Sequence, residues 1–203
     1  LVFFMLAAGP LAAQDASSTK YYGQESINAG LDDPPPLLDR ETPRAAFRGF
    51  QEAAEAGRFR RAAHFLNLAE VPPEEQPEVG PEIARRLALI IERQVWVDWN
   101  GLPSRPDAMI EMTGSSDPRA GQARRTLRIA TMEARETLYD IRISRYKPAE
   151  GDPVWLFSPQ TIRAVPALFG LYGPRQYETY IPQILKREFA GLWLWEWIAL
   201  PTL

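Results

Sequence analysis

The stretches Leu127-Arg-Ile-Ala130 and Tyr139-Asp-Ile-Arg-Ile-Ser144 decide the fold of this chain. In both, large apolar residues alternate with charged, polar or small ones, and a period of two is typical of strands that bury one face of a sheet. The residues between them predict an antiparallel hairpin that turns within 133–137. After the turn sequence Ala149-Glu-Gly-Asp-Pro153, Val154-Trp-Leu-Phe157 predicts a third strand.

The chain before these strands has the helical period instead. Thr42-Pro43 offers a capping hydroxyl followed by proline at the first helical position, so residues 43–68 predict two helices, with Gly57 ending the first. A third helix is expected from about Pro81 to Asn100-Gly101. The apolar faces of these helices are Phe47, Phe50 and Ala54, then Phe59, Ala62, Ala63 and Leu66, then Leu87, Ile90, Ile91 and Val95.

The segments after the strands complete the expected order of elements. Ser158-Pro159 again pairs a cap with proline, which predicts a helix to about Phe169. A last helix is expected from about Arg175 into the tryptophan-rich end, and the stretch 101–121, rich in proline and glycine, is expected to be a long loop. Helices first and strands later predict the α+β class, with N-terminal helices, an antiparallel sheet and a C-terminal helix leading toward a membrane.

Both ends of the chain are apolar, and they suggest how it is divided. Residues 1–13 resemble the hydrophobic part of a secretory signal peptide, with cleavage expected after Ala13. Residues 14–40, which hold three consecutive prolines, predict an extended linker outside the core. The α+β domain is expected over 41–173, and a juxtamembrane helix with the start of a transmembrane segment over 174–203. Because the chain begins without methionine and stops inside an apolar run, we interpret it as a piece of a longer protein.

The C-terminal segment predicts contact with a membrane interface. Trp193, Trp195 and Trp197 alternate near the start of the apolar run, and Lys186-Arg187 precedes them. Tryptophan rings and basic side chains are typical of the headgroup level of a bilayer. The alternative is a buried C-terminal helix of the domain itself.

The composition and the missing motifs argue against several classes of function. The chain of 203 residues has a net charge of -3 and no cysteine, so it offers no thiol chemistry and no electrostatic reason to bind nucleic acid. No Walker loop, dinucleotide fingerprint or G-x-S-x-G motif is present. We therefore expect a chain that is not an enzyme, with no catalytic residue, no metal ligand and no cofactor.

A few residues still merit individual hypotheses. His64, the only histidine, is expected on the polar side of the second helix as a solvated surface residue. Trp96 and Trp99 are expected to pack in the core from the third helix, with a ligand pocket under the helices as the alternative. Arg85-Arg86 and Arg124-Arg125 predict a solvated face with glutamate partners, and contact with anionic lipid headgroups is the alternative.

Several short segments follow one another in a specific order: Ile27-Asn-Ala-Gly-Leu31, Leu38-Asp-Arg-Glu-Thr-Pro-Arg44, Ala62-Ala-His-Phe-Leu-Asn-Leu68, Gly80-Pro81, Ala84-Arg-Arg-Leu87, Val154-Trp-Leu-Phe-Ser158, Thr161-Ile162, Ile181-Pro182 and Gly191-Leu-Trp-Leu-Trp195. In this order, over about residues 27–200, the chain resembles the N-terminal periplasmic domain of bacterial mechanosensitive ion channels, larger relatives of the small-conductance channel. The resemblance implies a periplasmic domain of an inner-membrane protein, regulatory or interacting, in a homo-oligomer. It places the pore outside this chain.

The helix–glycine–helix opening is also similar to the cone-shaped NTF2-like fold. That fold leaves open a secreted small-molecule-binding protein or enzyme. The sheet face under the helices distinguishes the two: an enzyme is expected to place Asp, His or Tyr side chains there, and a channel domain an apolar filling. A third possibility is a module that contacts peptidoglycan or lipid, which is expected to carry an exposed aromatic and arginine patch.

Overall fold

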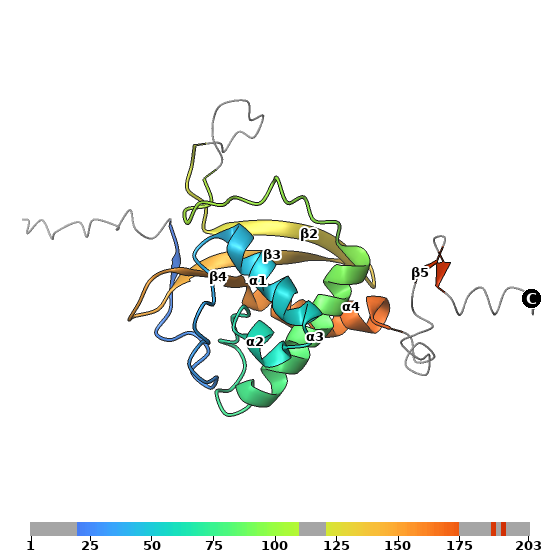
Figure 1. Cartoon of the computed structure of the whole chain (residues 1–203), viewed down its shortest axis with the longest axis horizontal. Coiled ribbons are helices and arrows are strands. Elements are labelled where there is room, and N and C mark those ends of the chain that lie inside the picture. The colour runs from blue at the N-terminus through green and yellow to red at the C-terminus, as the bar shows by residue number, and fades with distance from the viewer. Residues whose placement is uncertain (1–19, 110–120, 175–187, 190–191, 194–203) are drawn as a thin grey trace, which may run out of the picture.

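The computed structural model describes residues 20–109, 121–174, 188–189 and 192–193, the last four by their backbone alone. A short strand β1 (Tyr22–Gly23) is followed by three helices, three strands and a fourth helix (Figure 1). The described chain is a mixed α+β protein whose main sheet is open and four-stranded, so the expected class is confirmed. The expected signal peptide, residues 1–13, lies outside the described residues.

The central hairpin forms where the alternation predicts it. β2 (Thr126–Ala134) pairs antiparallel with β3 (Thr137–Lys147). Arg135 and Glu136 make the turn, with φ of 50° and 64°. Two successive residues in the left-handed region are typical of a type I′ turn, whose twist matches that of the paired strands. The turn sets the register from the pair Ala134–Thr137 to the pair Ala130–Ile141, and an irregularity between Arg128 and Ala130 shifts it by one position beyond that point.

The third strand widens the sheet at the end away from this turn. β4 (Val154–Phe157) pairs antiparallel with β3, and β1 pairs parallel with β3, Tyr22 opposite Tyr146. Residues 65–67 bond to β4: the Phe157 nitrogen donates to the Phe65 carbonyl at 2.8 Å, and the Phe157 carbonyl accepts from the Asn67 nitrogen at 2.9 Å. The sheet is therefore joined to the segment that follows the second helix.

The cap before the first helix and the glycine between the first two helices are found where the sequence predicts them. α1 (Pro43–Glu55) begins at Thr42, whose side chain accepts a hydrogen bond from the first turn at 3.1 Å. The chain turns at Gly57, with φ of 68°. α2 (Phe59–Ala63) is shorter than expected, because the chain turns at His64 and Phe65 and then runs along β4 from Leu66.

α3 (Gln76–Gln94) starts and ends earlier than expected, and Pro81 lies inside it. Its first residue, Gln76, is buried, and its side-chain nitrogen donates to the carbonyls of Leu68 at 3.1 Å and Val71 at 3.0 Å. These tertiary contacts anchor the first turn before the proline. The expected boundaries, Pro81 and Asn100-Gly101, are both wrong, since local sequence signals do not include such contacts.

α4 (Pro159–Tyr172) begins at the expected cap. The Ser158 hydroxyl accepts a hydrogen bond from the Thr161 nitrogen at 3.3 Å, and Pro159 occupies the first turn. The helix continues past the expected end at Phe169 and stops before Gly173.

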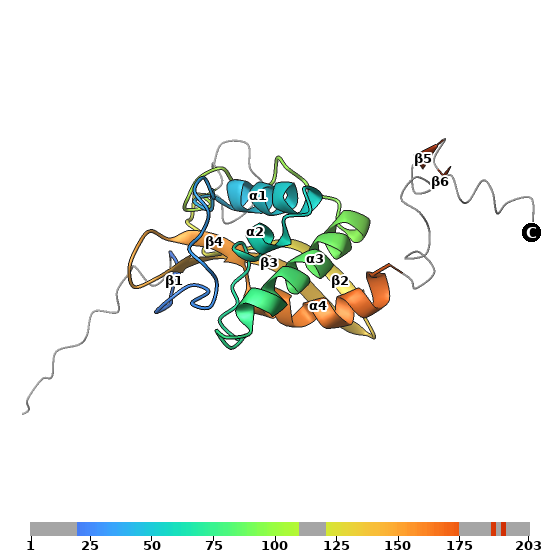
Figure 2. The same ribbon diagram turned by 60° about the horizontal axis from the view of Figure 1, so that its bottom comes forward.

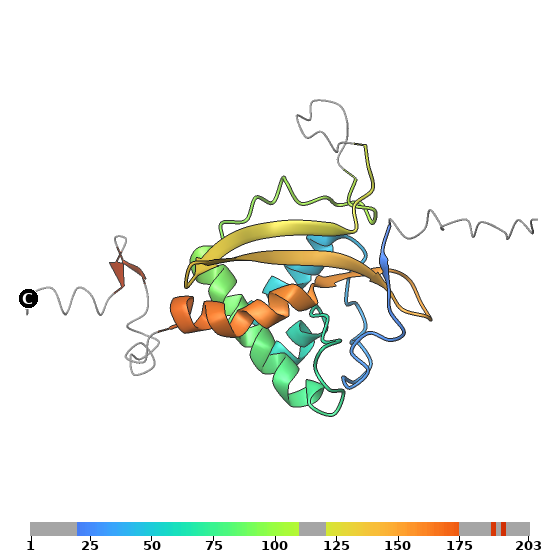
Figure 3. The ribbon, with the colours of Figure 1, turned by 180° about the vertical axis from the view of Figure 1, so that it is seen from behind.

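The helices lie on one face of the sheet (Figures 1 and 2). Figure 3 shows the opposite face of β2 and β3, which none of the described helices covers. The rings of Phe47 and Phe50 meet that of Phe157, with centroids 5.9 and 4.8 Å apart. The largest fully buried side chains are Trp155, Phe47, Phe50, Phe65, Phe157, Leu66, Leu68, Leu87, Ile90, Ile91, Ile141 and Ile143. The predicted helix faces supply half of these side chains, while Ala54, Phe59 and Val95 from the same faces are only half-buried.

The N-terminal arm, defined here as residues 20–41, is extended but not detached. The Gln24 nitrogen donates to the Lys147 carbonyl at 3.0 Å, and Leu31 and Leu38 pack against the core. The expectation that this segment lies outside the core is therefore wrong for these residues. An arm without a core of its own is stabilised by the surface that it covers.

The first part of the expected long loop also packs on the domain. Leu102 and Ala108 are buried, and the Arg44 side chain donates to the Leu102 carbonyl at 2.9 Å. Residues 110–120 lie outside the described part of the chain.

The C-terminal segment is described only at two short strands. β5 (Glu188–Phe189) and β6 (Leu192–Trp193) pair antiparallel, Glu188 opposite Trp193. At these four positions the expected helix is wrong. Within the described ranges, no helix combines the length and the apolarity needed to cross a bilayer.

Candidate functional site

The residues predicted to lie at a membrane interface fall almost entirely outside the described chain. Lys186, Arg187, Trp195 and Trp197 are not described, and Trp193 is described only as part of the β6 backbone. Their role stays a prediction. The candidate site is built from the described residues.

A groove of about 740 Å³ lies between the N-terminal arm and the turn that joins β3 to β4. Residues within 25–34 form one wall and residues 148–154 form the other. Leu38, Arg40, Glu41 and His64 complete the lining. Three separate parts of the sequence therefore meet at one surface.

Asn28 fixes the arm wall of the groove. Its side-chain nitrogen donates to the Leu66 carbonyl at 2.7 Å, and its side-chain oxygen accepts from the Leu68 nitrogen at 2.9 Å. Asn28 is buried and has φ of 52°, a conformation that asparagine tolerates better than most residues. One amide thus satisfies two backbone groups and holds the arm on the domain.

Gly30 allows the arm to approach the loop before α3. A Cβ at this position would lie 1.7 Å from the Pro73 carbonyl oxygen, so only glycine fits. The Gly30 nitrogen also donates to the Gln76 side-chain oxygen at 3.0 Å. Gln76 therefore links the arm, the start of α3 and the segment before it.

Arg40 is one of the two most enclosed ionisable groups of the groove. Its guanidinium donates to the His64 carbonyl at 2.9 Å, and its own carbonyl accepts from the Trp155 nitrogen at 2.7 Å. Its Nε atom is buried and makes no hydrogen bond to any described residue. Burial lowers the pKa of Arg40, and a guanidinium group in a protein keeps its proton at neutral pH.

His64 is the other enclosed group, and it is not the solvated residue that the sequence predicts. Only 8% of its surface is exposed. The helical wheel does not apply, since α2 ends at Ala63 and the following residues run buried along β4. Burial, and then the nearby Arg40 charge, lower the pKa of His64, while Asp32 opposes them. The imidazole is therefore neutral at pH 7 and can donate or accept a hydrogen bond.

The outer lining of the groove is acidic. Its carboxylates are Glu25, Asp32, Asp33, Glu41, Glu150 and Asp152, all on exposed residues. Against them the lining offers the Arg40 cation and neutral His64. This arrangement suits a polar or cationic group at the mouth and a hydrogen-bonding group further in.

The tryptophans expected in the core are not there. Trp96 and Trp99 follow the end of α3, and 87% and 37% of their surfaces are exposed. The Trp99 ring packs edge-on against Phe47 at 5.7 Å and lies under the Arg48 guanidinium at 5.7 Å. The expectation is wrong because α3 stops at Gln94, which ends the helical register.

The paired arginines of α3 match the expected solvated face. Arg85 and Arg86 bond to Glu82 at 2.8 and 2.7 Å, and all three side chains are partly exposed. The hydrogen bond from Arg85 is the main reason that the pKa of Glu82 is lowered to about 2. In the second pair, the Arg124 nitrogen donates to the Asp107 carbonyl at 2.9 Å and the Arg125 guanidinium lies 4.4 Å from the Tyr22 ring centroid.

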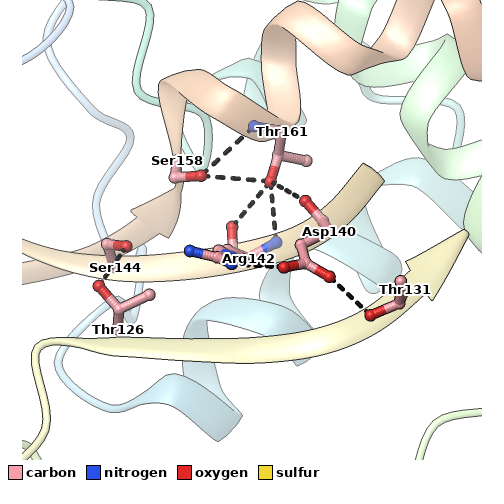
Figure 4. A network of polar contacts seen from close by, with 7 residues as sticks. All are labelled: Thr126, Thr131, Asp140, Arg142, Ser144, Ser158 and Thr161. Carbon is pink, nitrogen blue, oxygen red and sulfur yellow. Dashed lines mark hydrogen bonds and ion pairs between the residues drawn. The ribbon is translucent and has the colours of Figure 1, made fainter. Parts of the chain in front are cut away.

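Polar side chains on β2, β3 and α4 form a second cluster (Figure 4). The Thr161 hydroxyl accepts from the Arg142 nitrogen at 2.8 Å, and the Ser158 nitrogen donates to the Arg142 carbonyl at 2.9 Å. Asp140 accepts from Thr131 at 2.6 Å and pairs with the Arg142 guanidinium. Beyond the end of β4, the start of α4 thus supplies the hydrogen bonds that the edge of β3 would otherwise lack. The cluster therefore has a structural role.

Sequence reasoning had no independent signal for the groove. Asn28 and Arg40 lie in segments that were informative only through the family resemblance, and their roles depend on partners 38 and 24 positions away. Among the described residues, no three His, Asp or Glu side chains are placed to hold a metal ion. Comparisons with protein-family models, curated proteins and solved structures find no match to this chain.

Proposed function

We propose that this chain is a non-catalytic periplasmic domain of a bacterial mechanosensitive ion channel in the inner membrane, with a regulatory or interaction role. The pore belongs to a part of the protein outside this chain, and the complete protein is a homo-oligomer. The proposal starts from the order of sequence segments that resemble this family and adds the following observations.

The filling of the helix-covered sheet face carries the proposal. Ile141, Ile143 and Phe157 on that face are fully buried, and the Phe157 ring touches Phe47 and Phe50 of α1. An NTF2-like enzyme needs an open chamber with polar groups at this place. Because these packed rings leave no chamber for a ligand between the helices and the sheet in the described part of the chain, they favour a domain that binds its partners on its outer surface.

The segments that carry the resemblance also meet in space. Asn28 from the first segment bonds to Leu66 of the third, and Arg40 from the second bonds to His64 of the third. This supports the view that they build one surface, the groove beside the N-terminal arm. A surface of this kind suits an interaction role.

A secreted NTF2-like small-molecule-binding protein or enzyme is the second candidate. The observation that favours it is the groove itself, with a volume of about 740 Å³ and His64 in its lining. A smaller groove of about 500 Å³ between α1 and α3, lined partly by Phe50 and Phe59, offers a second place for a ligand. This candidate predicts saturable binding of a small molecule that His64→Gln weakens while the fold is kept.

Export and membrane attachment are tested with alkaline phosphatase, which is active only after export. The enzyme is fused after Arg187 in one chain and after Leu203 in another, both carrying a complete signal peptide. We expect the shorter fusion to be active in the periplasmic fraction and the longer fusion to be found in the membrane fraction. Release of both into the periplasmic fraction would favour the secreted candidate.

The channel itself is tested on the complete gene product. Membrane patches that contain it are expected to show a conductance that opens with suction, and deletion of residues 20–174 is expected to shift the pressure at half-opening while leaving the conductance. The absence of any suction-dependent conductance from correctly inserted protein would contradict the proposal.

A further inference from the structure

Three strongly exposed apolar side chains lie at the end of the domain from which the chain continues toward its C-terminus. They are Trp96, Leu138 and Leu171, with 87%, 69% and 57% of their surfaces exposed. Figures 1, 2 and 3 agree that the C-terminal ends of α3 and α4 and the turn between β2 and β3 lie together at this end. The N-terminal arm lies at the opposite end.

Leu138 and Leu171 lie on two elements, the β2–β3 hairpin and α4, that are bonded to each other and form a common framework. Leu138 pairs with Glu133 across the hairpin, and the Tyr172 hydroxyl donates to the Glu133 carbonyl at 2.6 Å. Leu171 precedes Tyr172 in the last turn of α4. The last turn of α4 is therefore fixed to the hairpin near its turn.

Trp96 is connected to the same framework through α3. It follows directly after the last residues of that helix, and α3 packs on α4, where the Arg86 guanidinium lies 5.3 Å from the Phe169 ring centroid. A tryptophan so exposed is unusual in a soluble domain, whereas at a lipid interface its ring is typically found at headgroup level.

We propose that this end, with Trp96, Leu138 and Leu171, rests on the surface of a lipid bilayer. The inference rests on the proposed membrane attachment of the C-terminal segment. The apolar run that begins at Phe189 follows Pro174 by 15 positions, and the chain toward it leaves the domain after α4, at this end and not at the arm end (Figure 1). An exposed apolar set on the tethered side fits contact with lipid.

Apolar contact rather than charge carries this attachment. At the hairpin turn Arg135 is adjacent to Glu136, and near the end of α3 Arg93 is adjacent to Glu92. The opposite charges cancel within each pair. The contact is therefore expected to form on zwitterionic phosphatidylcholine and to persist at high salt.

The absence of cysteine makes a site-by-site test possible. Trp96→Cys, Leu138→Cys and Leu171→Cys, each in the mature chain 14–203, are labelled with an environment-sensitive fluorophore. Leu37→Cys is the matched control, because Leu37 is 95% exposed but lies in the N-terminal arm. Circular dichroism verifies that each labelled chain is folded.

The labelled chains are mixed with phosphatidylcholine vesicles that contain nitroxide-labelled lipid. Nitroxide lipid is expected to quench the labels at positions 96, 138 and 171 at least two-fold more than the label at position 37, in 0.1 M and in 1 M salt. Equal quenching at all four positions, in chains that co-float with vesicles, would overturn the lipid contact and leave membrane attachment intact.

Two other outcomes also decide against it. If the chain does not co-float with vesicles, the proposed membrane attachment fails, and this inference fails with it. If the three labels become buried without vesicles as the protein concentration rises, the surface binds a second copy of the chain and not lipid.

Discussion

The side-chain nitrogen of Asn28 donates a hydrogen bond to the carbonyl of Leu66 at 2.7 Å, across 38 positions of sequence. The same amide accepts from the Leu68 nitrogen at 2.9 Å. The N-terminal arm is therefore fixed to the buried strand-like segment that also borders β4. This one residue links the groove wall to the core.

Asn28→Ala is expected to destabilise the domain by roughly 2–4 kcal/mol, because it leaves two buried backbone groups without partners. Urea unfolding measures the loss, and hydrogen exchange at the Leu68 amide reports whether the arm opens. Ala29→Ser, on the exposed neighbour, is the control and is expected to change stability by less than about 0.5 kcal/mol. Equal stability of the two variants would mean that the arm is not held at Asn28.

Gly30→Ala and Gly170→Ala form a matched pair with opposite expected signs. A Cβ at Gly30 meets the Pro73 carbonyl oxygen at 1.7 Å, whereas a Cβ at Gly170 meets nothing within 4 Å. We expect Gly30→Ala to cost roughly 1–3 kcal/mol by forcing the backbone apart. Gly170→Ala is expected to stabilise by about 0.5–1 kcal/mol, since alanine favours the helix. Thermal unfolding compares them, and a neutral Gly30→Ala would contradict the close approach.

Local signals in the sequence were sufficient for the β2–β3 hairpin and for the starts of α1 and α4. The β2–β3 hairpin is set by alternation and by a turn of two residues, and both can be recognised within a short window. Thr42 and Ser158 cap α1 and α4 as expected, because a cap depends on residues three positions away.

Hydrogen bonds from side chains to the backbone of other segments were not visible in the sequence patterns. α3 starts at Gln76 because that side chain bonds to Leu68 and Val71, which no periodicity reveals. The early end of α3 then removes Trp96 from the expected core face, and the early end of α2 buries His64. The groove depends on an arm whose composition alone predicts only an extended linker.

Thr161→Val tests the role of α4 at the edge of β3. Valine has nearly the same shape but cannot accept the hydrogen bond that the Arg142 nitrogen donates to Thr161 at 2.8 Å. We expect a loss of about 1–3 kcal/mol and faster hydrogen exchange at the Arg142 amide. Gln160→Ala, on an exposed position of the same helix, is the control and is expected to leave both unchanged. Unchanged exchange at Arg142 in Thr161→Val would show that the edge is protected by other contacts.

Phe50→Ala tests the filled sheet face that supports the proposed function. Phe50 is fully buried against Phe157, so its truncation is expected to cost about 3–5 kcal/mol. Phe59→Ala removes a ring of the same size that is only half-buried, and the expected cost is under about 2 kcal/mol. Chemical unfolding gives both values, and a reversed order would show that the helices do not pack on the sheet as described.

The pH dependence of stability reports on His64. Burial and the Arg40 charge lower the pKa of His64 in the folded chain, so the unfolded chain binds the proton more tightly. Because stability rises with pH wherever the unfolded state binds more protons, the domain is expected to lose stability as the pH falls below about 6.5, the ordinary pKa of histidine. The acid side chains act in a lower window. The pKa values of Glu82, Asp107 and Asp140 are lowered, so their contribution is present above the ordinary carboxylate pKa of about 4 and is lost below it.

Between pH 5 and 7.5, the change in the free energy of unfolding therefore reports on the protonation of His64. His64→Gln is expected to flatten the pH dependence in this window, since glutamine keeps a polar side chain that does not titrate. Glu82→Gln is the control: between pH 5 and 7.5 its curve should run parallel to that of the original chain at lower stability, because the contribution of Glu82 is constant in this window and is lost only at lower pH. A His64→Gln curve parallel to that of the original chain between pH 5 and 7.5 would mean that the imidazole titrates as freely as in the unfolded chain, against its burial beside Arg40.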